Sequence, residues 1–294
     1  MRTVFINPYK ENIFSDDGYC IVDLLTEAEL DEVRNHVLAF GYGADNPEKL
    51  RKSITSEHSV RKREFFERIL PVVKKPLNNF LANYRIILIT IFDKLPGGGV
   101  IKLHNHPNIV DEKKYRSVTV WIPLSDTSTK MGALHVIKGS HKIFTGLRTS
   151  KDYSRFDKVP DKIKLKYCIP LSLKSGQGVI FDDRLFHSSP PNKTTQIRTA
   201  IRLQLVPSEA DLEIYSRIND QVIKKYTFDE RVYMDALVSA VDPEKLESIE
   251  SLKVLGEVNQ PIVHWNKDNF TSIMQPILQD KKYKNQNIIR RIFG

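Results

Sequence analysis

The chain has 294 residues, 40 % of them hydrophobic, which is enough for one large domain with additions, or two small ones, around a substantial core. Only Cys20 and Cys168 are present, which excludes a disulfide framework, and no apolar run approaches the about 18 residues that a membrane span needs. The first residues also lack the apolar core and the cleavage site of a signal peptide. We therefore expect a soluble, cytoplasmic protein.

The formal net charge of +9 is compatible with an anionic partner, such as a phosphorylated or nucleotide-linked substrate, or with nucleic acid. The simpler interpretation, which we favour, is that the many lysines solvate the surface. Because the sequence contains no recognised nucleic-acid-binding module, we do not expect nucleic acid as a partner.

Two helices are predicted before residue 85. Residues 27–40 have helical spacing of apolar side chains, and Thr26 and Glu29 form a capping box at the start of this helix. Residues 63–84 predict a second helix, which we expect to be interrupted at the prolines in positions 71 and 76, because proline removes a backbone hydrogen bond.

From about residue 85 the hydrophobic period becomes that of β-strands. The strand-like segments are short, rich in β-branched residues and separated by Gly, Pro, Ser, Asn or Asp. One such segment, residues 18–25, lies earlier in the chain. The others are residues 85–95, 100–106, 117–126, 132–139, 165–173, 176–183 and 196–206. This pattern predicts an α+β fold that is mainly β, with a double-stranded β-helix, or jelly roll, at its core.

Helical spacing returns after Pro207. Ser208 is a suitable N-cap, and the apolar face that follows consists of Leu212, Tyr215, Ile218 and Val222. We therefore predict a jelly-roll domain with N-terminal helices at residues 1–207. Residues 208–294 are predicted to form a helical C-terminal extension that packs on the same domain.

The segment IKLHNHPN places His104 and His106 two residues apart at the end of a predicted strand. Side chains two apart on a strand point to the same side, so both imidazoles can face the interior of the jelly roll. A lone buried histidine would be interpreted as a core residue with satisfied hydrogen bonds, whereas for this pair we favour metal binding. His187, at the far end of a later strand, can supply a third ligand.

Arg198 begins the strand that follows the turn after His187, and its guanidinium can point into the same cavity. The planar fork of arginine suits bidentate binding of a carboxylate. Taken alone, Arg198 and Arg202 would be interpreted as members of surface ion pairs. Together with the three histidines, we favour a carboxylate-binding role for Arg198.

These segments resemble the phytanoyl-CoA dioxygenase family of iron(II)- and 2-oxoglutarate-dependent oxygenases. The resemblance rests on DDGYCIVDLL at 16–25, SVTVWIPLSDTSTKMGALHVIKGSH at 117–141 and GQGVIFDDRLFHSSPPNKTTQIR at 176–198. It implies that His104 and His187 are iron ligands and that Arg198 binds the distal carboxylate of 2-oxoglutarate. It also implies that Trp121 lines the co-substrate pocket, for which an ordinary core aromatic is the equal alternative, and that His141 belongs to a structural turn. The remaining histidines have no motif around them.

The sequence departs from the family at one ligand. The family's first ligand motif is His, any residue, then Asp or Glu, and this chain has His106 in the place of the carboxylate. The resemblance then implies a site of three histidines, which leaves three coordination positions of an iron open for 2-oxoglutarate and dioxygen. Asp111 is a disfavoured substitute ligand, because five residues beyond His106 it would need a tight turn. No catalytic residue beyond the ligands is assigned.

Hydroxylation of an unactivated C–H bond in a small or carrier-linked substrate is the expected activity. Residues 107–116 and 142–164 interrupt the strands and mix basic with aromatic side chains, so they could form a lid over an anionic substrate, although solvated loops are slightly favoured. Two alternatives stay open. One is a ligand-binding or scaffold protein that has lost turnover, and the other is a cupin-like dioxygenase with three histidines, which does not use 2-oxoglutarate.

Overall fold

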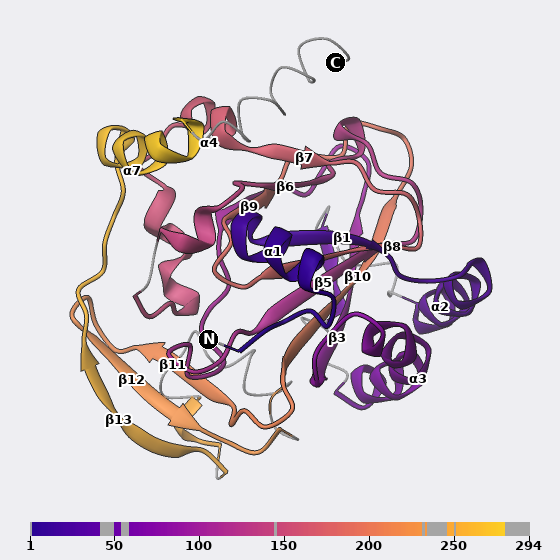
Figure 1. Ribbon diagram of the computed structural model, residues 1–294, viewed down its shortest axis with the longest axis horizontal. Coiled ribbons are helices and arrows are strands. Elements are labelled where there is room, and N and C mark those ends of the chain that lie inside the picture. Colours follow the sequence, from indigo (N-terminus) through magenta and orange to yellow (C-terminus); the bar gives the residue numbers. More distant parts are fainter. Residues whose placement is uncertain are drawn as a thin grey trace.

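The computed structural model describes residues 2–41, 50–53, 59–143, 146–230, 233, 246–249 and 251–279 (Figure 1). Two antiparallel sheets form the core, which confirms the predicted jelly-roll architecture. The larger sheet has the order β1 (Tyr19–Asp23), β8 (Gln177–Asp182), β5 (Val118–Pro123), β10 (Arg198–Pro207), β3 (Tyr84–Lys94) and β2 (Leu50–Lys52). The smaller sheet has the order β4 (Ile101–His104), β9 (His187–Ser189), β6 (Leu134–Val136) and β7 (Ile169–Leu171).

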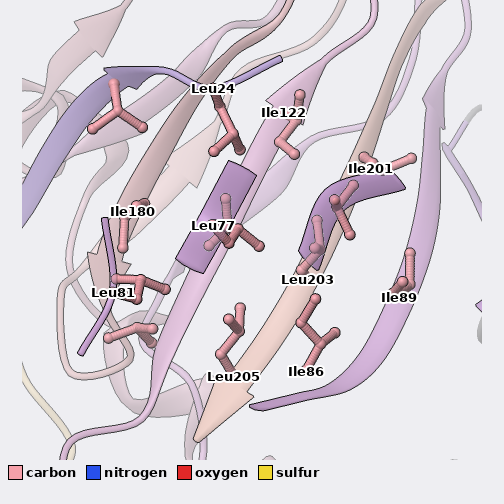
Figure 2. Packing of buried hydrophobic residues seen from close by; sticks show 14 of the residues in the cluster. Leu24, Leu77, Leu81, Ile86, Ile89, Ile122, Ile180, Ile201, Leu203 and Leu205 are labelled. Carbon is pink, nitrogen blue, oxygen red and sulfur yellow. The ribbon is translucent and has the colours of Figure 1, made fainter. Parts of the chain in front are cut away.

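The strand β10 shows how the larger sheet divides its two faces. Its odd-numbered residues Ile201, Leu203 and Leu205 pack into the hydrophobic cluster on the outer face, where Figure 2 shows them beside Leu77. Its even-numbered residues face the smaller sheet, and they include Arg198 and Arg202. Because strand residues alternate between faces, the inner face carries the polar side chains while the outer face is apolar.

The described residues before β3 include the helices α1 (Pro8–Asp17), α2 (Glu27–Phe40) and α3 (Ser59–Asn78). The predicted capping box of Thr26 and Glu29 at the start of α2 is confirmed. The expected interruption of the second helix is wrong, since α3 continues through both Pro71 and Pro76. Its apolar face, which includes Val73 and Leu77, is buried against the outer face of the larger sheet, and this packing outweighs the lost backbone hydrogen bonds.

The prediction of a helix after Pro207 is also wrong. Residues 213–227 instead form the hairpin β11 (Glu213–Arg217) and β12 (Val222–Thr227), which β13 (Lys253–Asn259) extends to a third sheet, seen at the lower left of Figure 1. The side-chain oxygen of Asn219 accepts hydrogen bonds from the backbone N–H groups of Gln221 and Val222, which closes the turn between the strands. The apolar residues of this segment fit a helical and a strand period equally, and the asparagine turn decides between them.

A C-terminal helix, α7 (Lys267–Gln279), is present as expected. Trp265, Phe270 and Met274 are buried in one cluster with Leu103 of β4 and Phe186, which directly precedes β9. The helix therefore packs behind the two strands that carry the histidine motifs. The domain limits of 1–207 and 208–294 remain a prediction, and residues 234–245 and 280–294 of the proposed extension lie outside the described residues.

No helix among the described residues is long and apolar enough to cross a membrane. The cytoplasmic location expected from the sequence remains a prediction.

Candidate metal centre

The fold brings His104, His106 and His187 together. His104 ends β4 and lies opposite His187, the first residue of β9, in the smaller sheet. The ring centroids of His104 and His187 are 4.2 Å apart, those of His106 and His187 are 4.7 Å apart, and those of His104 and His106 are 5.7 Å apart. One nitrogen from each ring lies within 4.8 Å of the other two, so the three imidazoles can hold one metal ion.

Each of the three rings has a hydrogen-bond acceptor at its Nδ1 atom. The carbonyl oxygen of Lys102 lies 2.8 Å from Nδ1 of His104, and that of Leu185 lies 2.9 Å from Nδ1 of His187. Two oxygen atoms lie at 3.0 Å from Nδ1 of His106, one of the Asp183 carboxylate and the other of the Thr119 hydroxyl. An acceptor at Nδ1 fixes the proton there and leaves the lone pair on Nε2, which is then the nitrogen available to a metal.

The electrostatics of the cluster favour neutral imidazoles. Burial lowers the pKa of His104 to about 4, and it lowers the pKa values of His106 and His187 well below their ordinary value. The Arg202 guanidinium acts in the same direction on all three rings. Neutral imidazole is the form that binds metals, so the donor set fits a divalent ion.

Asp183, which the sequence interpretation missed, is fully buried beside the cluster. Its carboxylate accepts hydrogen bonds from the hydroxyl of Thr119 at 2.8 Å and from the side-chain amide of Gln204 at 2.5 Å. Burial raises the pKa of Asp183 to about 6. The alternation of strand side chains could have indicated these residues from the sequence. Positions an even number of residues apart share one face of a sheet. Asp183 is two residues from Phe181, Thr119 is two from Trp121, and Gln204 is six from Arg198, so each shares a face with a residue of the cavity wall.

Arg198 points into the protein and has only 2 % of its surface exposed. Its Nη1 atom donates to the carbonyl oxygen of Gly132 at 2.8 Å, while its Nε atom has no hydrogen-bond partner in the described part of the chain. The guanidinium lies 5.1 Å from the ring centroid of Trp121, a cation–π arrangement that fixes its plane. A buried guanidinium whose Nε–H group has no hydrogen-bond partner among the described residues is suited to bind the carboxylate of a ligand.

The histidines and Arg198 line one cavity of about 400 Å³. Trp121, predicted as a pocket residue, is part of the wall. The cationic side chains in the lining are Lys52, Lys102, Arg198 and Arg202, whereas Asp157 is the one carboxylate among the described lining residues, and Lys102 pairs with it at 3.0 Å. The cavity is therefore positively charged and large enough for a small ligand next to the metal position.

Residues 107–116 and 142–164, for which solvated loops are predicted, are largely packed where the structure describes them. Val110 is buried in an apolar cluster, and Arg148 is buried in an ion pair with Glu112. From these segments, as far as the structure describes them, Ser154 and Asp157 reach the cavity wall. They form part of the body of the protein next to the cavity.

The other candidate residues lie elsewhere. Asp111 pairs with Lys114 and is not part of the histidine cluster, as expected. His141 lies in the short 3₁₀ helix Ser140–Lys142, where its Nε2 atom is 3.1 Å from the carbonyl oxygen of Ser15, in keeping with a structural turn. His58 lies outside the described residues.

The fold and the cavity define a jelly-roll protein with a cluster of three histidines that could hold a metal ion. Residues 14–200 match the family model described as phytanoyl-CoA dioxygenase (PhyH). The chain therefore belongs to the phytanoyl-CoA dioxygenase family.

The chain is also similar to individual proteins. Phytanoyl-CoA dioxygenase 1 of Oryza sativa subsp. japonica is 30 % identical over 119 residues, which are 40 % of this chain and 42 % of the rice protein, so the match spans less than half of that relative. The structure of HygX from Streptomyces hygroscopicus with nickel and 2-oxoglutarate bound is 14 % identical, with a TM-score of 0.50, and the match covers 69 % of this chain and 88 % of HygX. The 2-oxoglutarate-dependent carbocyclase SnoK from nogalamycin biosynthesis is 17 % identical with a TM-score of 0.49, over 70 % of this chain and 86 % of SnoK. Family membership and the histidine cluster agree with the predicted cofactors, iron(II) and 2-oxoglutarate.

Proposed function

We propose that this protein is a non-haem iron(II)- and 2-oxoglutarate-dependent oxygenase that hydroxylates an unactivated C–H bond of a small or carrier-linked, anionic substrate. The observation that carries the proposal is the meeting, in one cavity, of three neutral imidazoles and the buried Arg198 guanidinium. When bound, iron(II) and 2-oxoglutarate would supply the oxidation of the C–H bond by dioxygen, with release of succinate and carbon dioxide.

The residues have separate tasks in this proposal. His104, His106 and His187 would hold the metal through Nε2, beside the cavity that they line. Arg198 donates to the distal carboxylate of 2-oxoglutarate, and Trp121 keeps the guanidinium in the plane that this contact needs. The apolar wall beside them, which includes Phe181, keeps bulk water from the reacting atoms.

The burial of Arg198 supports a working site over a decayed one. Among the described residues the guanidinium forms no ion pair, and a buried charge without a partner is costly. A scaffold protein would gain stability by replacing it with an apolar side chain. A three-histidine dioxygenase that does not use 2-oxoglutarate would also have no carboxylate to place there.

The test is an anaerobic titration of the protein with Fe(II) and then with 2-oxoglutarate. We expect a visible metal-to-ligand charge-transfer band that needs both additions, because bidentate 2-oxoglutarate on Fe(II) is the absorbing species. Admission of air should then yield succinate. A protein that binds one equivalent of Fe(II) but develops no band with 2-oxoglutarate would refute the proposal.

Arg202 supports the anionic character of the substrate. It lies four residues from Arg198 on the same face of β10, and its guanidinium is 5.7 Å from the Phe92 ring centroid, with Lys52 Nζ at 5.9 Å from the same ring. The Nε atom of Arg202 is buried without a hydrogen-bond partner in the described part of the chain. Two cations over one ring in the cavity favour a phosphate or carboxylate group of the substrate, as in nucleotide-linked or carrier-bound molecules.

ADP is a suitable probe, because it carries the diphosphate shared by nucleotide-linked sugars and coenzyme A esters. We expect ADP to bind the metal-free protein, and Arg202→Gln to weaken this binding about 10- to 150-fold, since one charged hydrogen bond contributes about 1.5–3 kcal/mol. Lys113→Gln removes an equal charge from an exposed lysine outside the cavity lining and is the matched control. Equilibrium dialysis measures the affinity for ADP. Equal losses of affinity in the two variants would indicate only an effect of the net charge and would contradict this role of Arg202.

A further inference from the structure

Asp183 holds His106 at two points. The backbone carbonyl of Asp183 accepts a hydrogen bond from the backbone N–H of His106 at 2.8 Å, and its carboxylate lies 3.0 Å from Nδ1 of the His106 ring. On the other side, Nε of Arg148 donates to the carbonyl oxygen of His106 at 2.7 Å. The backbone and the ring of His106 are thus both fixed.

The carboxylate of Asp183 is itself held in a buried network. The Thr119 hydroxyl donates to Oδ1 at 2.8 Å, and the Gln204 amide donates to Oδ2 at 2.5 Å. The oxygen of the Thr119 hydroxyl also lies 3.0 Å from Nδ1 of His106, so this hydroxyl bridges the imidazole and the carboxylate. No lysine or arginine pairs with this carboxylate among the described residues, and its one ion-pair partner there is His106. Its neighbour Asp182, which is equally buried, instead pairs with Arg184. The negative charge of Asp183 is therefore directed at one imidazole of the cluster.

The placement of this charge matters because of the ligand set. Three neutral imidazoles leave the full charge of a divalent ion uncompensated, whereas two imidazoles and a carboxylate would cancel one unit. A carboxylate that accepts the Nδ1–H of a ligating imidazole makes that imidazole a more basic, partly anionic ligand. Asp183 lies in the position to do this for His106, the residue that replaces the carboxylate of the family motif.

We propose that Asp183 is a positioning residue that orients His106 and supplies, through its ring, the negative charge that the first ligand motif lacks. The inference rests on the proposed function, because it takes His106 to be a metal ligand. It adds a fourth residue to the centre, and it explains how a histidine can occupy the carboxylate position without making the site one charge more positive.

The experiment measures the affinity for Fe(II) by anaerobic competition with a chromophoric chelator, so it does not depend on turnover. We expect Asp183→Asn to weaken Fe(II) binding about 10- to 100-fold, the usual effect of removing a hydrogen-bond partner of a ligand. Asp182→Asn is the matched control, since it makes the same change at the next residue, whose partner is Arg184, and it should change the affinity less than about 3-fold. Thermal unfolding of the metal-free variants verifies that both are folded.

A second pair of variants separates charge from structure. His106→Asp alone places two carboxylates side by side, and like charges repel, so we expect Fe(II) affinity to fall. Adding Asp183→Asn to His106→Asp should raise the affinity again by about 10-fold, although Asp183→Asn lowers it in the wild-type background. If the role of Asp183 is purely structural, the losses of Fe(II) affinity in the two single variants should add in the double variant. If its charge matters, Asp183→Asn should lower the affinity in the wild-type background and raise it in the His106→Asp background.

The outcomes distinguish the two proposals. If the wild-type protein does not bind Fe(II), the proposed function fails. If the wild-type protein binds Fe(II) and Asp183→Asn binds it equally tightly, or if the effects of the two substitutions add, the role of Asp183 is refuted while the function stands.

Discussion

The His187→Ala variant is expected to lose tight Fe(II) binding, with an affinity reduced more than about 100-fold, because loss of a contact to a ligand alone costs 10- to 100-fold and here the ligand itself is removed. His187 is the ligand from the remote strand, and its ring lies 4.2 Å and 4.7 Å from the other two ring centroids. Formation of succinate from 2-oxoglutarate should fall to the background of free iron. Chelator competition and succinate release measure the two effects separately.

A histidine outside the cluster provides the control for this variant. His264 is exposed, and His264→Ala should leave both Fe(II) affinity and succinate formation within about 2-fold of wild type. Metal-free His187→Ala should unfold at a temperature close to that of the wild-type protein, since the ring is neutral and, among the described residues, makes one hydrogen bond, from Nδ1 to a backbone carbonyl. Retention of stoichiometric, tight Fe(II) binding by folded His187→Ala would show that the metal is held elsewhere.

The predictable part of the site depended on local spacing. Positions two apart on a strand face the same way, so the histidine pair at 104 and 106 could be predicted to face the interior from the sequence alone. The distance of His187 from this pair could not be predicted, because it depends on the antiparallel pairing that places His187 of β9 opposite His104 of β4. Pairing between strands more than eighty residues apart is a tertiary property.

Asp183, which was not predicted from the sequence, is a polar residue that contacts His106. Asp183 follows another aspartate, and the sequence does not say which of the two pairs with an arginine and which faces a histidine. The parity of Phe181 indicates the inward direction, but only the structure places Thr119 and Gln204 around the same carboxylate. The partners of a buried polar group come from different strands, and their meeting depends on the register of the whole sheet.

The errors after Pro207 and at α3 have a common origin. Apolar spacing in short segments fits more than one period, and proline weakens a helix without forbidding it. After Pro207 the turn at Asn219 favours a hairpin over a helix. In α3 the packing of the buried face stabilises the helix despite its prolines. Both outcomes were decided by interactions outside the pattern of apolar residues.

The Arg198→Ala variant is expected to bind 2-oxoglutarate between about 30-fold and several thousand-fold more weakly, since truncating one member of a buried, hydrogen-bonded charge pair costs about 2–5 kcal/mol. Fe(II) affinity should be retained, because Arg198 contacts none of the three imidazoles in the described hydrogen bonds. Arg198→Lys keeps the charge without the planar fork and should recover only part of the affinity. Calorimetric titration of the Fe(II)-loaded protein under anaerobic conditions measures all three proteins, and equal 2-oxoglutarate affinity in Arg198→Ala and wild type would contradict the assignment.

The same titration should show uptake of a proton, because a buried lysine lies next to Arg198. Lys94 is opposite Arg198 in the pairing of β3 with β10, and burial, together with the Arg198 charge, lowers the pKa of Lys94 to about 6. Above pH 6 this lysine is mostly neutral, and a dianion bound at Arg198 raises its pKa again, so binding takes up a proton and the apparent affinity falls as the pH rises above about 6. Repeating the titration at pH 7.5 in buffers of different ionisation enthalpy measures this proton, and it should disappear in Lys94→Met. A wild-type enthalpy independent of the buffer would contradict a change in the charge of Lys94 on binding.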